Sequence, residues 1–430
     1  FDPFALQTAS NVDLTIDRFD YLGYTYNNIG LQLSLQDHLL KGFIYSQNPA
    51  LRLSLGLNGN LTEKQQTIAI QGKIDSCYLD RMHLITEPIG GTLALNLSAS
   101  ASADSSYSAI LQIDNITLWN DWEKNSIRPV NLSFTTSPIH TRIGLKSGDL
   151  TLGFDSPSGV DSLSTRFSHG ASLMAEMLRG NNFYMDSVSQ QLPPFRLRAE
   201  AGDQNILNNF LKLQGIGFKN MDIDASLQDS LSFKFNMIVN QLNAGNIQLD
   251  TLTLSLRQQQ QQLNYLLRVA NHPGNLDSLG MIALYGNIAG NEAILNCLQE
   301  GRAGNVGFRF GLRSRVADST ITISMFPENP IFGSEPWQVN QNNYIAYHFG
   351  HDLHADFRLT HNTQHVSLTT PNHTESGPLT LDIQGIDIGK TLALFLPSTT
   401  VGGILSTKVT LHKQDLSGNS LDVNGLLNLA

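Results

Sequence analysis

Residues 26–37 read YNNIGLQLSLQD, and residues 218–229 read FKNMDIDASLQD. At this constant offset the two copies share Asn, Ser, Leu, Gln and Asp, and large apolar residues coincide at 29 and 221 and at 31 and 223. The match continues past the turn, where Leu39 corresponds to Leu231 and Phe43 to Phe235. The repeated unit is therefore predicted to be a hairpin of two alternating strands around an Asp-centred turn. A long sheet built from such units must cover its apolar face or use it.

The polar residues of this chain are mostly uncharged. Charged residues are only 15% of its 430 residues, and the formal net charge is -10. A nucleic-acid surface needs a clustered basic face, which this sequence lacks. No run approaches the roughly 20 apolar residues of a membrane span, and no signal peptide is recognisable. We therefore expect no nucleic-acid partner and no membrane helix within this chain.

The ends of the chain indicate a piece of a longer protein, because it opens at Phe1 without Met and stops at Ala430 while a strand is under way. Its two cysteines, Cys77 and Cys297, have no neighbours at metal-ligand spacing. They are predicted to be isolated buried thiols, with a disulfide between them as the alternative.

Apolar and polar residues alternate with a period of two along most of the chain, which predicts strand after strand. The clearest run covers residues 51–57, and a turn is predicted at Asn58-Gly59-Asn60. The glutamine tract 258–262 is predicted to be the turn between two long strands. Four runs supply the candidate lining of an apolar groove, dominated by Leu and Phe: Leu51, Leu53, Leu55, Leu57, Leu93, Leu95, Leu97, Phe233, Phe235, Met237, Val239, Phe308, Phe310 and Leu312.

Helical patterns interrupt the strands. Residues 161–179 are predicted to form the main helix, capped by Asp161 and ended by Gly180, with one apolar face made of Leu163, Phe167, Ala171, Met174 and Leu178. Shorter helices are predicted over 204–212 and 388–396. The predicted segments are a β segment at 1–157, a helix-containing interruption at 158–215, a β segment with the repeated hairpin at 216–386, and the start of a further module at 387–430.

The sequence contains none of the common catalytic motifs: it has no nucleophile elbow, no phosphate-binding loop and no zinc-binding helix motif. Six histidines between His348 and His373 could suggest a metal site. On a strand, however, His348 and His354 share a face while His351 points the other way, so we favour polar-face histidines on adjacent strands. Trp119 and Trp122 could anchor at a membrane interface, but a local packing cluster is favoured. We expect no enzyme, no cofactor and no metal.

The sequence resembles one known family. Residues 336–345 read PWQVNQNNYI and lead into paired strands at 353–359 and 366–368, and residues 377–403 combine an alternating strand with Phe395-Leu396-Pro397 and Val401-Gly402-Gly403. This sequence pattern resembles that of the TamB family of AsmA-like envelope bridge proteins, which are components of the translocation and assembly module. In that family a Pro-Trp and a polar turn precede paired strands. The Asn- and Gln-rich polar face is similar to Bacteroidota-type members.

The resemblance implies an all-β protein with few short helices: an elongated antiparallel β-taco, a U-shaped sheet with an apolar groove. Such proteins are anchored in the inner membrane, here through a region outside this chain, cross the periplasm and meet an Omp85-type outer-membrane barrel. They are linked to phospholipid transport in outer-membrane biogenesis, and in another view to assembly of outer-membrane proteins. The expected partners are therefore phospholipid acyl chains and the barrel, and the expected location is the periplasm.

Three functions remain open at this stage: a lipid conduit, a scaffold that offers strand edges to outer-membrane proteins, and a closed β-sandwich binding protein. Alternation alone does not choose among them, because sandwich strands alternate too. The recurring hairpin and the scarcity of polar interruptions favour the conduit. An elongated chain should also give a small-angle scattering radius of gyration well above the roughly 22 Å of a compact 430-residue globule.

Overall fold

The computed structural model describes residues 10–180, 182–229, 231–245, 247–271, 280–301, 304–349, 353–371, 378–389, 402–411 and 423–429. Strands make up 67% of the structure, the sheet is antiparallel, and it is not closed into a barrel. The predicted all-β class is therefore confirmed. The predicted helix at 388–396 lies mostly outside the described residues.

The chain divides into two compact units. The first consists of Phe1–His169, Gln191–Asp229 and Asn236–Ile247, and the second of Gly170–Gln190, Ser230–Phe235 and Gln248–Ala430. All three helices of the described chain fall within the predicted interruption at 158–215: α1 (Val160–Arg179), α2 (Met185–Gln191) and α3 (Ile206–Leu213).

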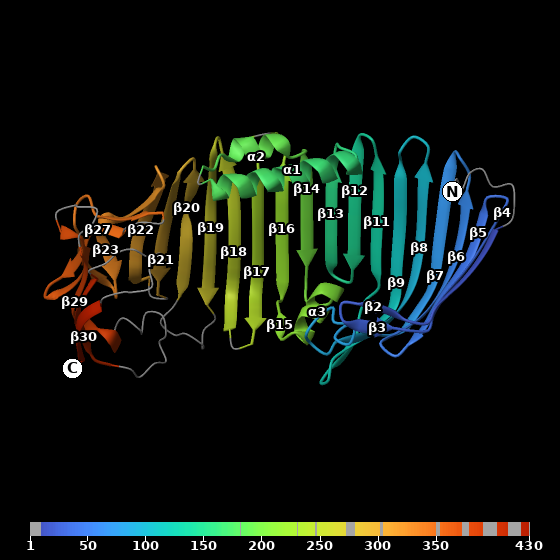
Figure 1. The fold of residues 1–430 in the computed structure, drawn as a ribbon, viewed down its shortest axis with the longest axis horizontal. Helices are drawn as coiled ribbons and strands as arrows, with labels where there is room; N and C mark the ends of the chain where they lie inside the picture. Colours follow the sequence, from blue (N-terminus) through green and yellow to red (C-terminus); the bar gives the residue numbers. More distant parts are fainter. Residues whose placement is uncertain are drawn as a thin grey trace. The chain divides into compact units, whose positions relative to one another are not determined.

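The strands of the first unit follow one another mostly in chain order (Figure 1). They are β1 (Ser10–Ile16), β2 (Phe19–Tyr21), β3 (Tyr24–Tyr26), β4 (Ile29–Gln36), β5 (Leu39–Asn48), β6 (Leu51–Leu61), β7 (Gln65–Tyr78), β8 (Gly90–Ser102), β9 (Tyr107–Trp119), β10 (Lys124–Ser126), β11 (Val130–Ser137), β12 (His140–Ser147), β13 (Leu150–Ser156), β14 (Phe195–Ala201), β15 (Ile216–Gly217), β16 (Asn220–Leu227) and most of β17 (Lys234–Ala244). β2 and β3 form a separate small hairpin.

The first copy of the repeated stretch forms the predicted hairpin, and the second copy forms two neighbouring strands without the tight turn. In the first, β4 and β5 pair around Asp37 and His38, whose φ values of 50° and 66° give the primed turn that suits two twisted strands. In the second, β16 and β17 are neighbours in the sheet, but a longer connection joins them. Phe43, the counterpart of Phe235, lies on the polar face of β5 and is 43% exposed.

One predicted turn is wrong. Asn58, Gly59 and Asn60 remain within β6, and Leu61 is the last residue of the strand. The two asparagines point to the exposed face, where a polar side chain costs nothing, and Gly59 pairs with Ile68 of β7. The predicted turn in the glutamine tract is confirmed, because Gln260 and Gln261 connect two long strands.

The second unit is built in the same way. Its strands are β18 (Ile247–Gln259, all but its first residue), β19 (Gln262–Asn271), β20 (Met281–Ala289), β21 (Glu292–Glu300), β22 (Val306–Ala317), β23 (Thr320–Phe332), β24 (Glu335–Pro336), β25 (Gln338–Val339), β26 (Tyr344–His348), β27 (Leu353–His361), β28 (Gln364–Thr369), β29 (Leu379–Asp387), β30 (Ile404–Leu411) and β31 (Val423–Leu429). From β18 to β23 each strand pairs with the next, so the apolar residues of successive strands fall on one face.

Candidate functional site

An unbroken row of apolar residues and glycine crosses the sheet of the first unit. Cross-strand partners lie on the same face of a sheet, so the printed registers trace the row directly. It runs through Val12, Leu33, Gly42, Leu57, Ile70, Leu97, Leu111, Leu132, Leu145, Leu152, Ala199 and Ile223. With neighbouring strands about 4.8 Å apart, the row continues for about 50 Å. We call the face that carries it the floor.

The opposite face of the same sheet is polar. The residues adjacent in sequence to the floor row also form a row of cross-strand partners: Asp13, Gln32, Phe43, Gly56, Gln71, Asn96, Gln112, Asn131, Lys146, Thr151, Glu200 and Asp222. We call this set the outer row. Because it faces water, only the floor needs to be explained as an apolar surface.

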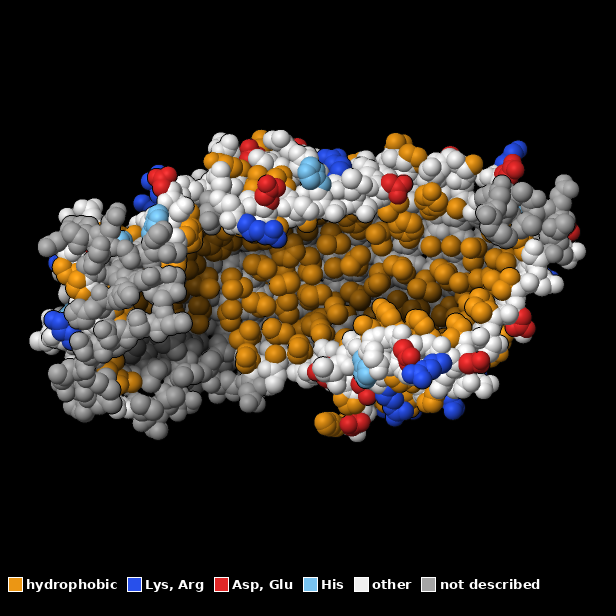
Figure 2. All heavy atoms as spheres, in the orientation of Figure 1, with side chains coloured by type: hydrophobic (Ala, Val, Ile, Leu, Met, Phe, Trp, Pro, Cys, Tyr) orange, Lys and Arg blue, Asp and Glu red, His pale blue; other side chains and the backbone are white. Residues whose placement is uncertain are grey.

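The floor is not covered like the core of a sandwich. Between Leu33 and Ile223, every member of the floor row except Ala199 is partly exposed. Mid-strand leucines of a sealed two-sheet core are ordinarily fully buried. Figure 2 shows these strands from the floor side, with hydrophobic side chains filling a hollow between two rims. An apolar surface of this extent marks an interaction site rather than a random surface patch.

The N-terminal half of α1 forms one rim. Leu163 is 6% exposed, and Phe167 packs 5.5 Å from Phe195 of β14 between ring centroids. The Arg166 side chain donates to the backbone carbonyls of Gln191 and Leu192. The helix therefore covers the ends of the neighbouring strands and leaves their middles uncovered.

The predicted helix 161–179 is confirmed, with two corrections. Thr136 Oγ1 of β11, not Asp161, accepts the first backbone N–H, that of Val160, at 3.1 Å. Ala171 and Leu178 are exposed, whereas Gly170 is buried and Met177 is partly buried. The apolar face is thus shifted by one residue in the C-terminal half, because a 3.6-residue period drifts from strict i+4 spacing.

α3 forms part of the opposite rim. Its N-cap Asn205 accepts from the Asn208 N–H at 2.9 Å, as a capping asparagine does. Ile206 and the partly buried Leu93 pack against a small cluster of the buried residues Ile116, Ile127 and Val130. The predicted helix at 204–212 is therefore confirmed, and it closes this edge of the floor.

Asp149 ties α3 to the sheet. Its carboxylate accepts from the Asn205 side chain at 2.7 Å and from the Gln204 N–H at 3.0 Å. Burial raises the pKa of Asp149, but the hydrogen bonds from Asn205, Gln204 and Gly202 outweigh that effect and leave the pKa below its usual value. The ionised form is therefore the one that holds the helix.

Asp149→Ala is expected to lower the free energy of unfolding by about 1 kcal/mol at pH 7, a modest value because the carboxylate is solvent-accessible. Since folding lowers the pKa, this stabilisation is present above the usual pKa of an Asp carboxyl and is lost as the pH falls through the lowered value. Urea unfolding at pH 7 and pH 3 measures the difference, with exposed Asp121→Ala as the control. An equal difference at both pH values would refute the assignment.

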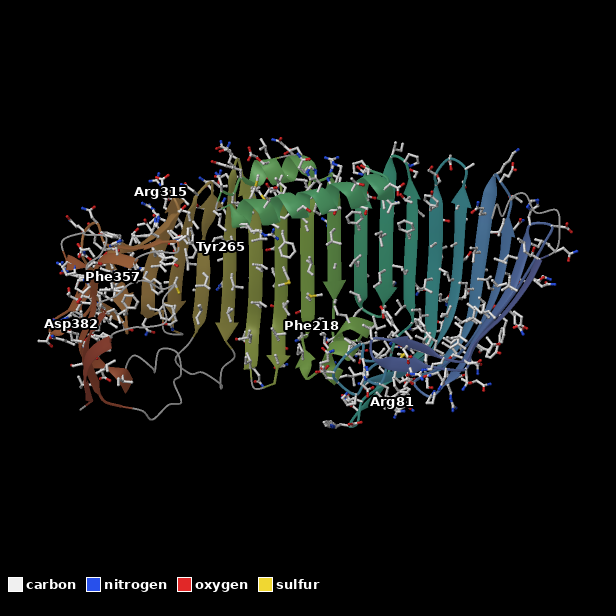
Figure 3. All side chains as sticks on the ribbon, viewed as in Figure 1. Arg81, Phe218, Tyr265, Arg315, Phe357 and Asp382 are labelled. Carbon is white, nitrogen blue, oxygen red and sulfur yellow. The ribbon has the colours of Figure 1, made fainter. Side chains whose placement is uncertain are left out.

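The second unit carries a matching apolar face. One row on it runs through Leu256, Tyr265, Gly286, Leu295, Leu312 and Met325. Tyr265, labelled in Figure 3, pairs with Gly286, and its hydroxyl donates to the Ile294 carbonyl at 2.8 Å. The ring therefore crosses the strand at the glycine, and burial raises the pKa of the Tyr265 hydroxyl.

The registers place the predicted groove residues as follows. Leu53, Leu55 and Leu57 of β6 and Leu93, Leu95 and Leu97 of β8 share the floor through Ile74, Gly72 and Ile70 of β7, and Leu51 pairs with Cys77 beyond a bulge in β7. Phe308, Phe310 and Leu312 lie on the apolar face of the second unit. Phe235, Met237 and Val239 share one face of β17, and Phe233 precedes that strand. All are partly exposed except Val239 and Phe308, which are buried.

The remaining candidate residues have structural roles. Both cysteines are free, Cys297 buried and Cys77 partly buried, and burial raises the pKa of each thiol, so the prediction of isolated thiols is confirmed. His348 hydrogen-bonds Thr320, and His365 pairs with Asp382 at 3.3 Å. His351 and His373 lie outside the described residues, within which no group of three His, Cys, Asp or Glu could hold a metal.

The predicted Trp119–Trp122 cluster is wrong. Trp119 packs edge-on against Tyr78, with ring centroids 5.9 Å apart, whereas Trp122 is 76% exposed. Asn120 accepts the N–H groups of Trp122 and Glu123 in a tight turn, and this turn directs the second indole outward.

Comparison with protein-family models and with curated proteins finds no match for this chain. Among the described residues, no helix has the length and apolar character needed to cross a membrane.

Proposed function

We propose that this chain is a section of an envelope bridge that conducts phospholipids between the inner and outer membranes, with acyl chains lying on the apolar sheet face. The observation that carries the proposal is the partly exposed floor row, from Leu33 to Ile223, above a polar outer row. The role is non-enzymatic, because a lipid path acts by solvation and forms or breaks no bond.

The energetic case rests on the acyl chain. Exposing one CH2 group to water costs about 0.8 kcal/mol, so a tail of about 16 carbons faces about 12 kcal/mol in crossing an aqueous space. A continuous apolar surface removes most of that barrier and at the same time loses its own contact with water. Contact between the acyl tail and the floor therefore removes apolar surface of both from water.

The resemblance to the TamB family supports the wider setting. On that basis we propose a periplasmic location, an inner-membrane anchor outside this chain and an Omp85-type barrel as the partner at the outer membrane. These proposals rest on the sequence pattern around Pro336 and Trp337 and on the alternating strands, and not on any catalytic motif.

The direct experiment purifies the protein from an envelope fraction without detergent exchange and examines it by native mass spectrometry and lipid extraction. Phospholipid should accompany the folded protein in defined stoichiometry. A lipid-free protein that also fails to take up phospholipid from vesicles would overturn the proposal.

A second candidate function has its own observation. β1 pairs with β4 and, among the described strands, with no other, while Val12 and Leu14 are 50% and 45% exposed. An edge of this kind can accept an added strand, as a scaffold for outer-membrane proteins requires. The scaffold predicts crosslinks from β1 to polypeptide, whereas the conduit predicts crosslinks from the floor to lipid. Partial exposure of the floor counts against the third candidate, a closed sandwich.

A further inference from the structure

A pocket of about 500 Å³ lies in the second unit. Six apolar side chains from the strands of this unit contribute to its lining: Phe308, Phe310, Phe332, Leu359, Val366 and Ile386. Its size is typical of a site for a small molecule or for one part of a larger ligand.

These lining residues come from two distant parts of the sheet. The first three lie on β22 and β23, and the last three lie on β27, β28 and β29. Successive pairings lead from β22 through β23, β26, β27 and β28 to β29. Five steps of about 4.8 Å would separate β22 from β29 by about 24 Å in a flat sheet. Because side chains of both groups line one pocket, the sheet curls around it.

Trp337 connects the two groups of strands. It lies between β24 and β25 and is 9% exposed. Its ring centroid is 6.3 Å from that of Phe332 in β23 and 5.4 Å from that of His361 in β27. The pocket therefore has walls on more than one side, in contrast to the single apolar surface that the floor row offers.

Three polar side chains of the wall are already bonded to the protein backbone. Trp337 Nε1 donates to the Phe332 carbonyl at 3.3 Å, and Gln364 Nε2 donates to the Gly385 carbonyl at 2.8 Å. The third, His361, has Nδ1 at 2.8 Å from the carbonyl oxygen of the residue before Trp337. A polar ligand group would lose its water here without replacement by these groups, a cost that a hydrocarbon chain does not have.

Two acidic residues also contribute to the lining. Glu335 is exposed and so remains in contact with water, and Asp387 already interacts with another group of the protein. Neither calls for a cation from a ligand. The apolar side chains therefore decide which class of ligand the pocket takes.

The pocket is continuous with the apolar face of the second unit. Phe310 lines the pocket and pairs with Cys297, which in turn pairs with Leu284. Leu312, two residues further along β22, lies on the same face and pairs with Leu295. A hydrocarbon chain on this face can enter the pocket without leaving apolar surroundings.

We propose that this pocket receives the terminal part of one acyl chain, which enters tail-first from the apolar face of β22 while the head group stays outside. The inference deepens the lipid path proposed above and rests on it. The floor row supports a chain from one side only, whereas the pocket surrounds it. The second unit therefore holds an acyl chain at a fixed place and depth.

The fluorescence of Trp337 tests this inference. The chain has three tryptophans, so replacement of Trp119 and Trp122 by Phe leaves Trp337 as the only one. Bromine quenches tryptophan emission on contact. Dodecanoate brominated on its terminal carbon should therefore quench most of the Trp337 emission with saturation, and dodecanoate brominated next to the carboxylate should quench little. Equal quenching by the two probes, stronger quenching by the second, or no saturable quenching by either would overturn the proposal.

The chain length of the probe provides a second measurement. Each CH2 group that is taken out of water contributes about 0.8 kcal/mol, so the Kd of the terminally brominated acids should fall about fourfold per added CH2 between octanoate and dodecanoate. A Kd that is independent of chain length over this range would contradict burial of the tail.

Variants that fill the pocket locate the binding site. Leu359→Phe combined with Val366→Phe should weaken binding of the terminally brominated dodecanoate about tenfold or more. Leu266→Phe is the control, because Leu266 pairs with Tyr285 on the opposite face of the sheet, and binding should be unchanged. Unchanged binding by a folded double variant, as judged by circular dichroism, would refute the assignment. If the double variant does not fold, the two bromine positions decide in the parent protein.

The two proposals fail in different ways. If the pocket assignment is wrong, crosslinking of lipid from the first unit's floor persists while terminal bromine does not quench Trp337. If the lipid path is wrong, floor crosslinking is absent while the quenching of Trp337 persists.

Discussion

Leu55→Arg is expected to leave the protein folded and to abolish its association with phospholipid. Leu55 pairs with Ile44 and Gly72 on the floor and is partly exposed, so the longer Arg side chain can carry its charge to water. The cost in free energy of unfolding should be about 1–2 kcal/mol, not the 4–5 kcal/mol of an unpaired charge in a closed core. Phe235→Asp should behave in the same way.

Lipid association fails because a fixed charge keeps water where the acyl chain must lie. Phospholipid recovered with the variant should fall about tenfold or more. Gln32→Arg supplies the matched control, since it adds the same charge on the outer row beside Asp13. Thermal unfolding and lipid quantification on the same preparations separate the two effects. A Leu55→Arg protein that does not fold would mean that this face is a sealed core.

Gly286→Ala is expected to destabilise the second unit by about 3 kcal/mol or more. A Cβ at this position would overlap the Ile294 carbonyl oxygen and lie 3.0 Å from the Tyr265 hydroxyl oxygen. The carbonyl belongs to the paired strand β21 and cannot move without loss of ladder hydrogen bonds. The same substitution displaces the Tyr265 ring from its position across β20.

Gly153→Ala is the control for this prediction. Gly153 lies on the outer face of β13 with nothing within 4 Å of the added Cβ, so the change should be neutral or slightly stabilising. Chemical unfolding of both variants measures the contrast. Equal stability of Gly286→Ala and the parent protein would show that the strands can separate at this point and that the glycine is not required there.

The sequence predicts the strands of this fold well because a period of two is local information. Leu51 to Leu57 and the repeated hairpin show it without reference to the rest of the chain. The error at Asn58-Gly59-Asn60 has a physical cause: turn residues are tolerated in a strand whose outer face is in water. The one-residue shift in α1 has a local cause as well: a 3.6-residue period drifts from strict i+4 spacing, so Gly170 and Met177 are covered in place of Ala171 and Leu178.

A pocket of about 500 Å³ in the second unit, lined in part by aromatic rings, could not be predicted from the sequence, for a different reason. Phe308 of β22, Phe332 of β23 and Asp387 of β29 line this pocket together with Trp337, which lies between β24 and β25, and only the register of the sheet brings these distant residues together. The Pro336-Trp337 pair carries the family resemblance, but the sequence alone does not mark it as part of a site. A single long-range pairing, Phe308 with Phe332, would have been enough to suggest the pocket.

The central claim is that lipid travels on the floor and not on the outer row, and site-specific photocrosslinking in growing cells tests it most directly. A photoreactive residue is placed at Leu97, Leu111 or Leu145, and in matched variants at Asn96, Gln112 or Lys146, each one residue away and on the opposite face. We predict phospholipid adducts from the three floor positions and none from their outer neighbours. Adducts of equal yield from both faces, or none from the floor of a folded protein, would contradict the account.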